Sequence, residues 1–139
     1  MGFDVIGRKP KTRTGQFFGA SIAYWTPIWE YVAATCSDIL TEEQIEWGYA
    51  NDGVRIRAKH ADEIGKRLRK LVRSGETAEY IAAQQKRRRK KPGTKSVALM
   101  NVRKLAKALG GHIEDESLSV DAVRKLANFC VASGGFEID

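Results

Sequence analysis

A run of consecutive basic residues near the middle of the chain is the strongest candidate for chemistry in this sequence. The run consists of Lys86, Arg87, Arg88, Arg89, Lys90 and Lys91. Guanidinium and ammonium groups at this density bind phosphate groups through their charge and their N–H donors. Such binding is largely independent of base sequence and weakens as salt is added. The run therefore predicts a segment that binds nucleic acid.

The segment before this run is predicted to be a helix with one basic face, ending at Gly75, a residue typical of a helix C-terminus. Its apolar residues recur at helical spacing: Ala61, Ile64, Gly65, Leu68, Leu71 and Val72. Its opposite face carries a basic set: Lys59, Lys66, Arg67, Arg69, Lys70 and Arg73. We expect Arg67, Lys70 and Arg73 to form a second row of phosphate contacts beside the run.

The positive charge of the protein is concentrated in one third of the chain. The net charge is +7, whereas residues 54–95 alone carry a net +11. A charged stretch of this kind is also typical of a solvated helix face followed by a charged connector. The concentration of charge leaves these two interpretations about equally supported. In both, residues 84–95 form an exposed basic arm or linker within a single domain that covers residues 1–139.

No motif joins the other titratable residues into a catalytic centre. Asp52, His60, Glu63 and Cys130 include acid–base types, but no nucleophile elbow, P-loop or metal triad connects them. The two cysteines and the two histidines lack neighbours at ligand spacing, so we expect buried thiols, no disulfide and no metal site. The sequence therefore predicts a protein that is not an enzyme and that needs no cofactor.

The aromatic residues gather in segment 16–32, which must supply much of the core. This segment holds six of the twelve Phe, Trp and Tyr residues, and each buried aromatic removes roughly 150–250 Å² from water. Thr26 as an N-cap before Pro27 predicts that a helix begins there. The preceding residues fit either a strand or a helix. Any exposed part of the cluster would mark a protein or dimer interface, and the candidates are Trp25, Trp29 and Tyr31.

The fold class that these patterns predict is mainly α, a compact bundle of four to six helices. Capping signals and apolar spacing place helices at 27–39, 42–48, 58–74, 76–90, 96–109 and 120–133. The two ends, Gly2–Ile6 and Gly135–Asp139, both alternate with a Phe and predict a short two-stranded element that joins the termini. A hairpin that pairs segment 47–49 with segment 54–56 is the alternative to the second helix.

Three further patterns carry less weight. A helix-turn-helix over 105–128 would need a connection much longer than the usual 3–4 residues. The aromatic cluster would suit base stacking, but clusters at helical spacing are more typical of a core. A pentapeptide pattern, Val-Arg-Lys-Leu-Ala, recurs along the chain, and we interpret it as shared amphipathic helix character and not as a repeat architecture. It occurs at 102–106 and 123–127, with a looser copy at 68–72.

Targeting and membrane signals are not found in the sequence. No stretch reaches 18 apolar residues, and Asp4 stands where a signal peptide would be basic. We therefore expect no membrane partner and a cytoplasmic location.

Several separate motifs resemble a family of small uncharacterised proteins encoded by phages, prophages and bacteria. They are the start at Met1–Gly7, the aromatic segment Trp25–Tyr31, the turn Asn51–Gly53 and the end at Phe129–Ile138. The family has no established activity, so it implies no functional residues here. Relatives can carry paired-cysteine insertions in the middle of the chain; this sequence has a basic segment there, and a metal role does not carry over.

Two functions follow as hypotheses. The first is a non-enzymatic, phage-type accessory protein whose basic arm binds nucleic acid or a nucleic-acid-containing host complex, with inhibition of a host defence system as one form. The second is a protein-binding or oligomerisation module that uses exposed aromatics to bind a host protein or a second copy, the basic arm being incidental.

Overall fold

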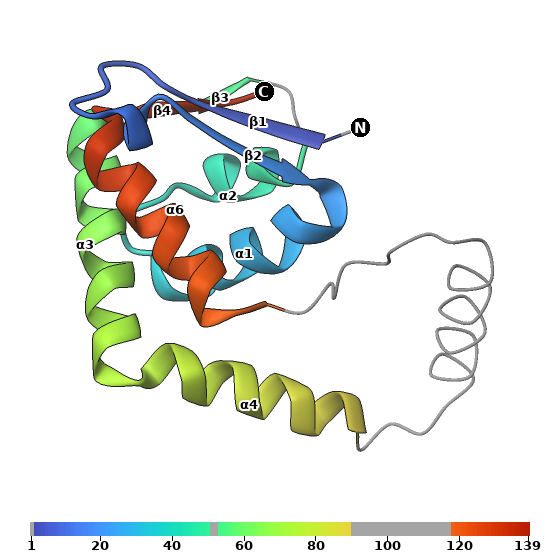
Figure 1. Cartoon of the computed structure of the whole chain (residues 1–139). Coiled ribbons are helices and arrows are strands. Elements are labelled where there is room, and N and C mark those ends of the chain that lie inside the picture. Colours follow the sequence, from blue (N-terminus) through green and yellow to red (C-terminus); the bar gives the residue numbers. More distant parts are fainter. Residues whose placement is uncertain (1, 51–52, 90–117) are drawn as a thin grey trace, which may run out of the picture.

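The computed structural model describes residues 2–50, 53–89 and 118–139. In this part of the chain, five α-helices accompany a four-stranded antiparallel sheet. Figure 1 shows the sheet on one side, with α1 (Ile22–Thr35), α2 (Glu42–Gly48) and α6 (Val120–Ser133) beneath it. Helix α3 (Ala58–Ser74) runs along their edge, and α4 (Glu76–Arg89) lies on the side of the helices away from the sheet. The prediction of a mainly helical protein with a minor β element is confirmed.

The sheet joins the two ends of the chain, as predicted. Strands β1 (Gly2–Gly7) and β4 (Phe136–Ile138) pair antiparallel, with Val5 opposite Ile138. The backbone N–H groups of Asp4 and Asp139 each donate to the other residue's carbonyl, at 2.9 and 2.8 Å. Alternate side chains point into the core, so Phe3 and Val5 are buried.

The prediction of two strands was incomplete, because two more strands flank this pair. Strand β2 (Phe17–Ser21) pairs with β1, and β3 (Val54–Ile56) pairs with β4, giving the order β2-β1-β4-β3. The alternative hairpin was wrong, because segment 54–56 pairs with β4 and Trp47 lies in helix α2 (Glu42–Gly48). A capping box between Thr41 and Gln44 starts that helix, as predicted.

The first helix begins five residues earlier than predicted. Helix α1 runs from Ile22 to Thr35, and its N-cap is Ser21, whose Oγ accepts from the Tyr24 N–H at 3.1 Å. Pro27 lies inside the helix, and the Thr26 hydroxyl donates to the Ile22 carbonyl at 2.8 Å. The extra turn places Trp25 on the same buried face as Ile28 and Trp29. That burial outweighs the backbone hydrogen bond that Pro27 cannot donate.

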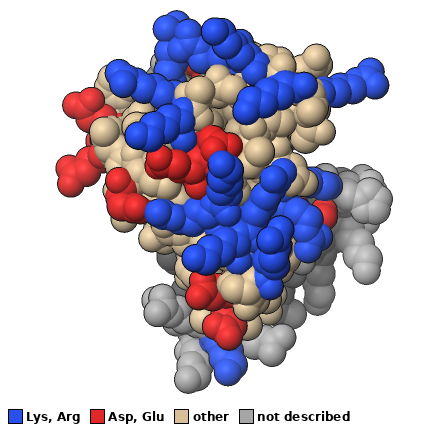
Figure 2. Space-filling model, turned by 90° about the vertical axis from the view of Figure 1, so that its left-hand side faces the viewer, with Lys and Arg blue, Asp and Glu red and all other residues tan. Residues whose placement is uncertain are grey.

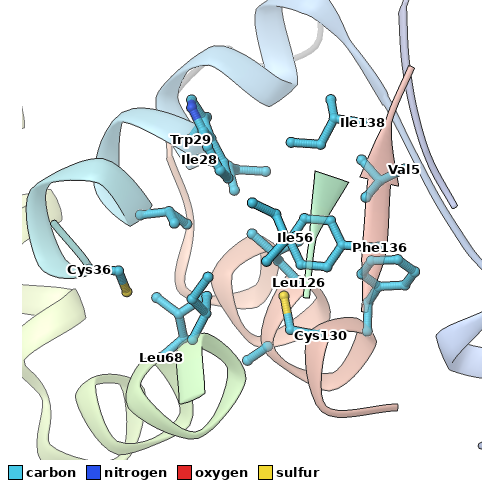
Figure 3. Packing of buried hydrophobic residues seen from close by; sticks show 14 of the residues in the cluster. Val5, Ile28, Trp29, Cys36, Ile56, Leu68, Leu126, Cys130, Phe136 and Ile138 are labelled. Carbon is cyan, nitrogen blue, oxygen red and sulfur yellow. The ribbon is translucent and has the colours of Figure 1, made fainter. Parts of the chain in front are cut away.

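Two tryptophans of α1 hold α2 against the core. The indole rings of Trp25 and Trp29 stack with centroids 5.5 Å apart. Their Nε1–H groups donate to the carbonyls of Gly48 and Ile45, each at 2.8 Å. A Cβ at position 48 would lie 2.1 Å from the Trp29 ring, so a glycine is needed there. Figure 3 shows Trp29 and Ile28 pointing toward side chains of the sheet, α3 and α6.

Helices α3 (Ala58–Ser74) and α6 (Val120–Ser133) pack along their length. The caps agree with the sequence: Ser119 Oγ accepts from the Ala122 N–H at 3.1 Å, and Gly75 ends α3 with a φ of +87°. The predicted helix over 96–109 and the turn at 51–52 lie outside the described residues.

Helix α4 (Glu76–Arg89) is attached to the core at its first turn. Thr77 is fully buried, and its hydroxyl makes a 2.8 Å hydrogen bond with the Tyr31 hydroxyl. The Tyr31 and Tyr80 rings also meet, with centroids 4.6 Å apart. Burial raises the pKa of the Tyr31 phenol, so this hydroxyl keeps its proton.

The Tyr31–Thr77 bond predicts a specific pattern of stability. Tyr31→Phe keeps the ring but leaves the Thr77 hydroxyl without this partner, so the free energy of unfolding should fall by about 1–3 kcal/mol. Urea unfolding followed by circular dichroism measures the change. The double variant Tyr31→Phe/Thr77→Val should lose less than the sum of the two single variants, because neither hydroxyl remains. Strict additivity would contradict an anchoring role for this bond.

Candidate nucleic-acid interface

The outward side of α3 is a dense basic surface. Figure 2 shows lysine and arginine side chains gathered over this helix. We call the surface the α3 basic face; its exposed members are Lys59, Lys66, Arg69, Lys70 and Arg73. Lys66 is paired with Asp62 at 2.8 Å, one turn away on the same helix. The structure therefore confirms that this helix is exposed on the side that carries these five basic residues and buried on its apolar side.

A hollow of about 330 Å³ lies where this face meets α6. We call it the α3–α6 hollow; its lining consists of Arg69, Val72, Arg73, Arg124 and Asn128. Three of these five residues carry a guanidinium group, and none carries a carboxylate. Cations held close together without an intervening anion repel one another, so the hollow is electrostatically suited to an anion.

Arg69 is held in place by α6. Its Nε and Nη2 atoms both donate to Oδ1 of Asn128, at 3.2 and 3.0 Å. Because both bonds use one edge of the planar guanidinium group, they fix its orientation. Asn128 is neutral, so the positive charge of Arg69 is not compensated by this contact.

Arg124 and Arg73 retain most of their capacity to bind. Arg124 lies 4.0 Å from a carboxylate oxygen of Asp121, while Lys125 lies closer to that carboxylate, at 3.2 Å. The side chains of Arg124 and Asp121 are 56% and 64% exposed, so their attraction is screened and weak. Arg73 has no ion-pair partner within the described residues.

Arg67, predicted to be a phosphate contact, is engaged elsewhere. Both of its Nη atoms donate to the carboxylate of Asp38, and Nη1 also donates to the Thr35 carbonyl at 3.1 Å. The hydrogen bond from Arg67 lowers the pKa of Asp38. This residue therefore ties α3 to the segment after α1, and it does not line the hollow. Lys70 belongs to the α3 basic face, as predicted, and Arg73 lines the hollow.

The basic run lies at the other end of α4. Lys86 is exposed, and Arg87, Arg88 and Arg89 complete the last turn of the helix. Figure 1 shows this end of α4 pointing away from α3. Lys90 and Lys91 lie outside the described residues. Within the described chain, the start of the run and the predicted second row therefore lie on different helices.

The predicted partner interface is corrected by burial. Trp25, Trp29 and Tyr31 are 0%, 1% and 2% exposed, so their side chains cannot meet a partner on the surface of this fold. Their rings and hydrogen-bonding groups are used against α2 and α4 instead. Large apolar side chains that are exposed lie elsewhere: Ile6, Phe17, Ile22, Trp47 and Tyr49.

Sequence reasoning missed the contribution of α6. Arg124 and Asn128 were not candidate site residues, and Arg69 was noted without a role. A signal was present in the repeated pentapeptide, because Arg69 and Arg124 occupy the same position in the copies at 68–72 and 123–127. The packing of α3 on α6 brings these two arginines to one hollow. The copy at 102–106 lies outside the described residues.

The described residues contain neither a cluster typical of a metal site nor an activated thiol. Within it, no group of three or more His, Cys, Asp or Glu residues could hold a metal ion. Cys36 and Cys130 are buried, and burial raises the pKa of both thiols, which makes them poor nucleophiles. None of the helices in the described residues is long and apolar enough to cross a membrane.

Comparisons of the chain with protein-family models, curated proteins and solved structures gave no match.

The pair between Arg67 and Asp38 predicts a pH-dependent contribution to stability. Arg67→Gln should lower the urea midpoint at pH 7, because the folded-state pKa of Asp38 lies below its ordinary value of 3.8. A carboxylate whose pKa is lowered on folding stabilises the fold at pH values above its ordinary pKa. This added stability is lost as the pH falls through the folded-state pKa. The difference between wild type and variant should therefore shrink in acid. Lys70→Gln, which removes an equal charge from the same helix, is the control and should show no such trend.

Proposed function

We propose that this protein binds nucleic acid without catalysing a reaction on it, and that the α3 basic face and the α3–α6 hollow form the primary contact. One observation carries the proposal: three arginines from two helices line one hollow without a carboxylate among the lining residues. The basic end of α4 is a second, separate contact.

Nucleic acid suits this surface better than a small acidic metabolite does. From Lys59 to Arg73 the helix rises roughly 21 Å at 1.5 Å per residue. Phosphates along one strand of a duplex are about 3.4 Å apart, so a face of this length matches several successive phosphates. Guanidinium groups also present paired N–H donors that fit phosphate oxygens. The expected binding is therefore electrostatic and tolerant of base sequence.

The resemblance of separate motifs to phage and prophage proteins sets the biological context of this proposal. In that context the ligand is host or phage nucleic acid, or a host complex that contains it, and inhibition of a host defence system is one consequence of occupying such a complex. The cytoplasm is the compartment where these ligands are found.

Protein binding is the second candidate function, and it is supported by two exposed aromatics. Trp47 and Tyr49 are 53% and 41% exposed on either side of Gly48, whereas Gly48 itself packs against the buried Trp29 ring. Large aromatics that remain exposed are enriched at protein interfaces. This surface lies on α2 and is distinct from the α3–α6 hollow.

A salt series tests the first function. Wild type, Arg69→Gln/Arg73→Gln/Arg124→Gln and a control, Arg8→Gln/Lys11→Gln/Arg13→Gln, would be titrated into fluorescent DNA and RNA of mixed sequence by anisotropy. If the three hollow arginines each meet one phosphate, removing them lowers the slope of log affinity against log salt by about 2.7. The control variant has the same net charge as the hollow variant, so it should keep most of the wild-type salt slope.

Two results of that series would count against the proposal. Absence of binding by wild type at low salt would contradict nucleic-acid binding altogether. Equal losses in the hollow variant and the control would show that net charge matters and that the hollow does not. Neutralising the run from Lys86 to Lys91 in a further variant measures the contribution of the α4 end.

The exposed aromatics give an independent prediction. Trp47→Ala/Tyr49→Ala should fold normally and keep wild-type affinity for nucleic acid, because neither residue lines the hollow. Unfolding temperature and anisotropy measure both properties. If sedimentation shows that wild type self-associates and that this variant does not, the second candidate function gains direct support. A loss of nucleic-acid affinity in this variant would instead contradict our placement of the interface.

A further inference from the structure

We propose that the α3–α6 hollow is a preorganised subsite for a single backbone phosphodiester, in which Asn128 acts as a positioning residue for Arg69. This inference rests on the proposed nucleic-acid binding and makes it specific, by naming the group bound and the residue that sets the geometry. Its basis is the pair of hydrogen bonds between two helices that otherwise meet through apolar packing.

The bonding of Arg69 leaves one complete donor edge available. A guanidinium group has five N–H bonds: one on Nε and two on each Nη. Asn128 Oδ1 accepts from Nε and from Nη2. Two N–H bonds on Nη1 and one on Nη2 therefore remain. One from each Nη atom lies along the same edge of the group, and these two can donate in parallel to two oxygens of a phosphate. Asn128 thus holds Arg69 in a binding orientation without using up its charge.

The other lining residues complete a site for a monoanion. Arg73 follows Arg69 by four residues on α3, so both lie on the same side of that helix. Arg124 approaches from α6, and the Asp121 carboxylate beside it is nearer to Lys125. Val72 offers no side-chain hydrogen-bonding group, so recognition falls to the arginines and Asn128. The volume of about 330 Å³ admits a phosphate together with its adjoining sugar.

The source of the phosphate can be distinguished by pH. A terminal phosphate monoester has a second pKa of about 6, so its charge changes near neutral pH, whereas a diester keeps one charge. The arginines stay protonated throughout. Binding of a 5′-hydroxyl oligothymidylate should therefore be constant between pH 5.5 and 8. A 5′-phosphorylated oligothymidylate that binds more tightly only at the higher pH would overturn the assignment to a diester.

Two substitutions of Asn128 test its positioning role. Asn128→Asp keeps the shape of the side chain but pairs a carboxylate with Arg69, and affinity for oligothymidylate should fall about tenfold. Gln16→Asp, at an exposed position outside the hollow, adds the same charge and is the control. Asn128→Ala removes the acceptor and no charge, so affinity should fall about threefold while the salt slope stays unchanged. Unfolding temperatures establish that each variant is folded.

A direct measurement separates this inference from the proposed function. Titration of wild type with inorganic phosphate should shift the Nε–H NMR signals of Arg69, Arg73 and Arg124 in a saturable way. If oligothymidylate binds but Asn128→Asp behaves like Gln16→Asp, the subsite is overturned and nucleic-acid binding stands. If phosphate shifts the three signals but no oligonucleotide binds, nucleic-acid binding is overturned and the hollow remains an anion site. If phosphate shifts none of the three signals and no oligonucleotide binds, both the phosphate subsite and nucleic-acid binding are overturned.

Discussion

The close approach of α3 and α6 at Gly65 is the constraint on which the rest of the structure depends. A Cβ at this position would lie 2.5 Å from Cγ2 of Val131 and 2.9 Å from the carbonyl oxygen of Ala127, so α6 packs directly against the Gly65 backbone. The contact keeps Leu68 and Leu126 in one core. Because α6 leads directly into β4, it also fixes where the C-terminal strand enters the sheet between β1 and β3. The α3–α6 hollow follows from the same packing, one helical turn further along α3.

Features of the fold that depend on neighbouring residues could be predicted from the sequence. The capping box at Thr41 and the left-handed stop at Gly75 are local, and both are found in the structure. The start of α1 was not predictable in this way, because Thr26–Pro27 is a good local signal that tertiary burial overrides. Strand β3 has three residues, and its partner lies about eighty residues later in the chain. Nothing within so short a segment indicates which strand it will join.

The sequence predicted the part of the candidate site that lies on one helix, but not the contacts between helices. Helical spacing placed Lys70 and Arg73 on an exposed basic face of α3, and the structure agrees. Spacing could not reveal that Arg67 pairs with Asp38, since that carboxylate comes from another part of the chain. Nor could it show that Arg69 and Arg124 meet, because this depends on how two helices pack. The same limit applies to Trp25 and Trp29. Composition does not show whether an indole is buried, whereas the structure shows that hydrogen bonds from both indole N–H groups to α2 allow them to be buried.

The separation of the two basic surfaces constrains how they could act together. Helix α4 has 14 residues, which corresponds to about 21 Å of rise. Its N-terminal part is anchored by Thr77 and Tyr80, and Figure 1 shows its basic end pointing away from α3. A ligand that reaches both surfaces must be an extended polyanion, because a single phosphate or a mononucleotide is too short. Once such a ligand is bound at the hollow, its contact with the α4 end is intramolecular. This contact raises the overall affinity even when the α4 end alone binds weakly. If the proposed binding occurs, two basic segments on one fold should favour long nucleic acid over short fragments.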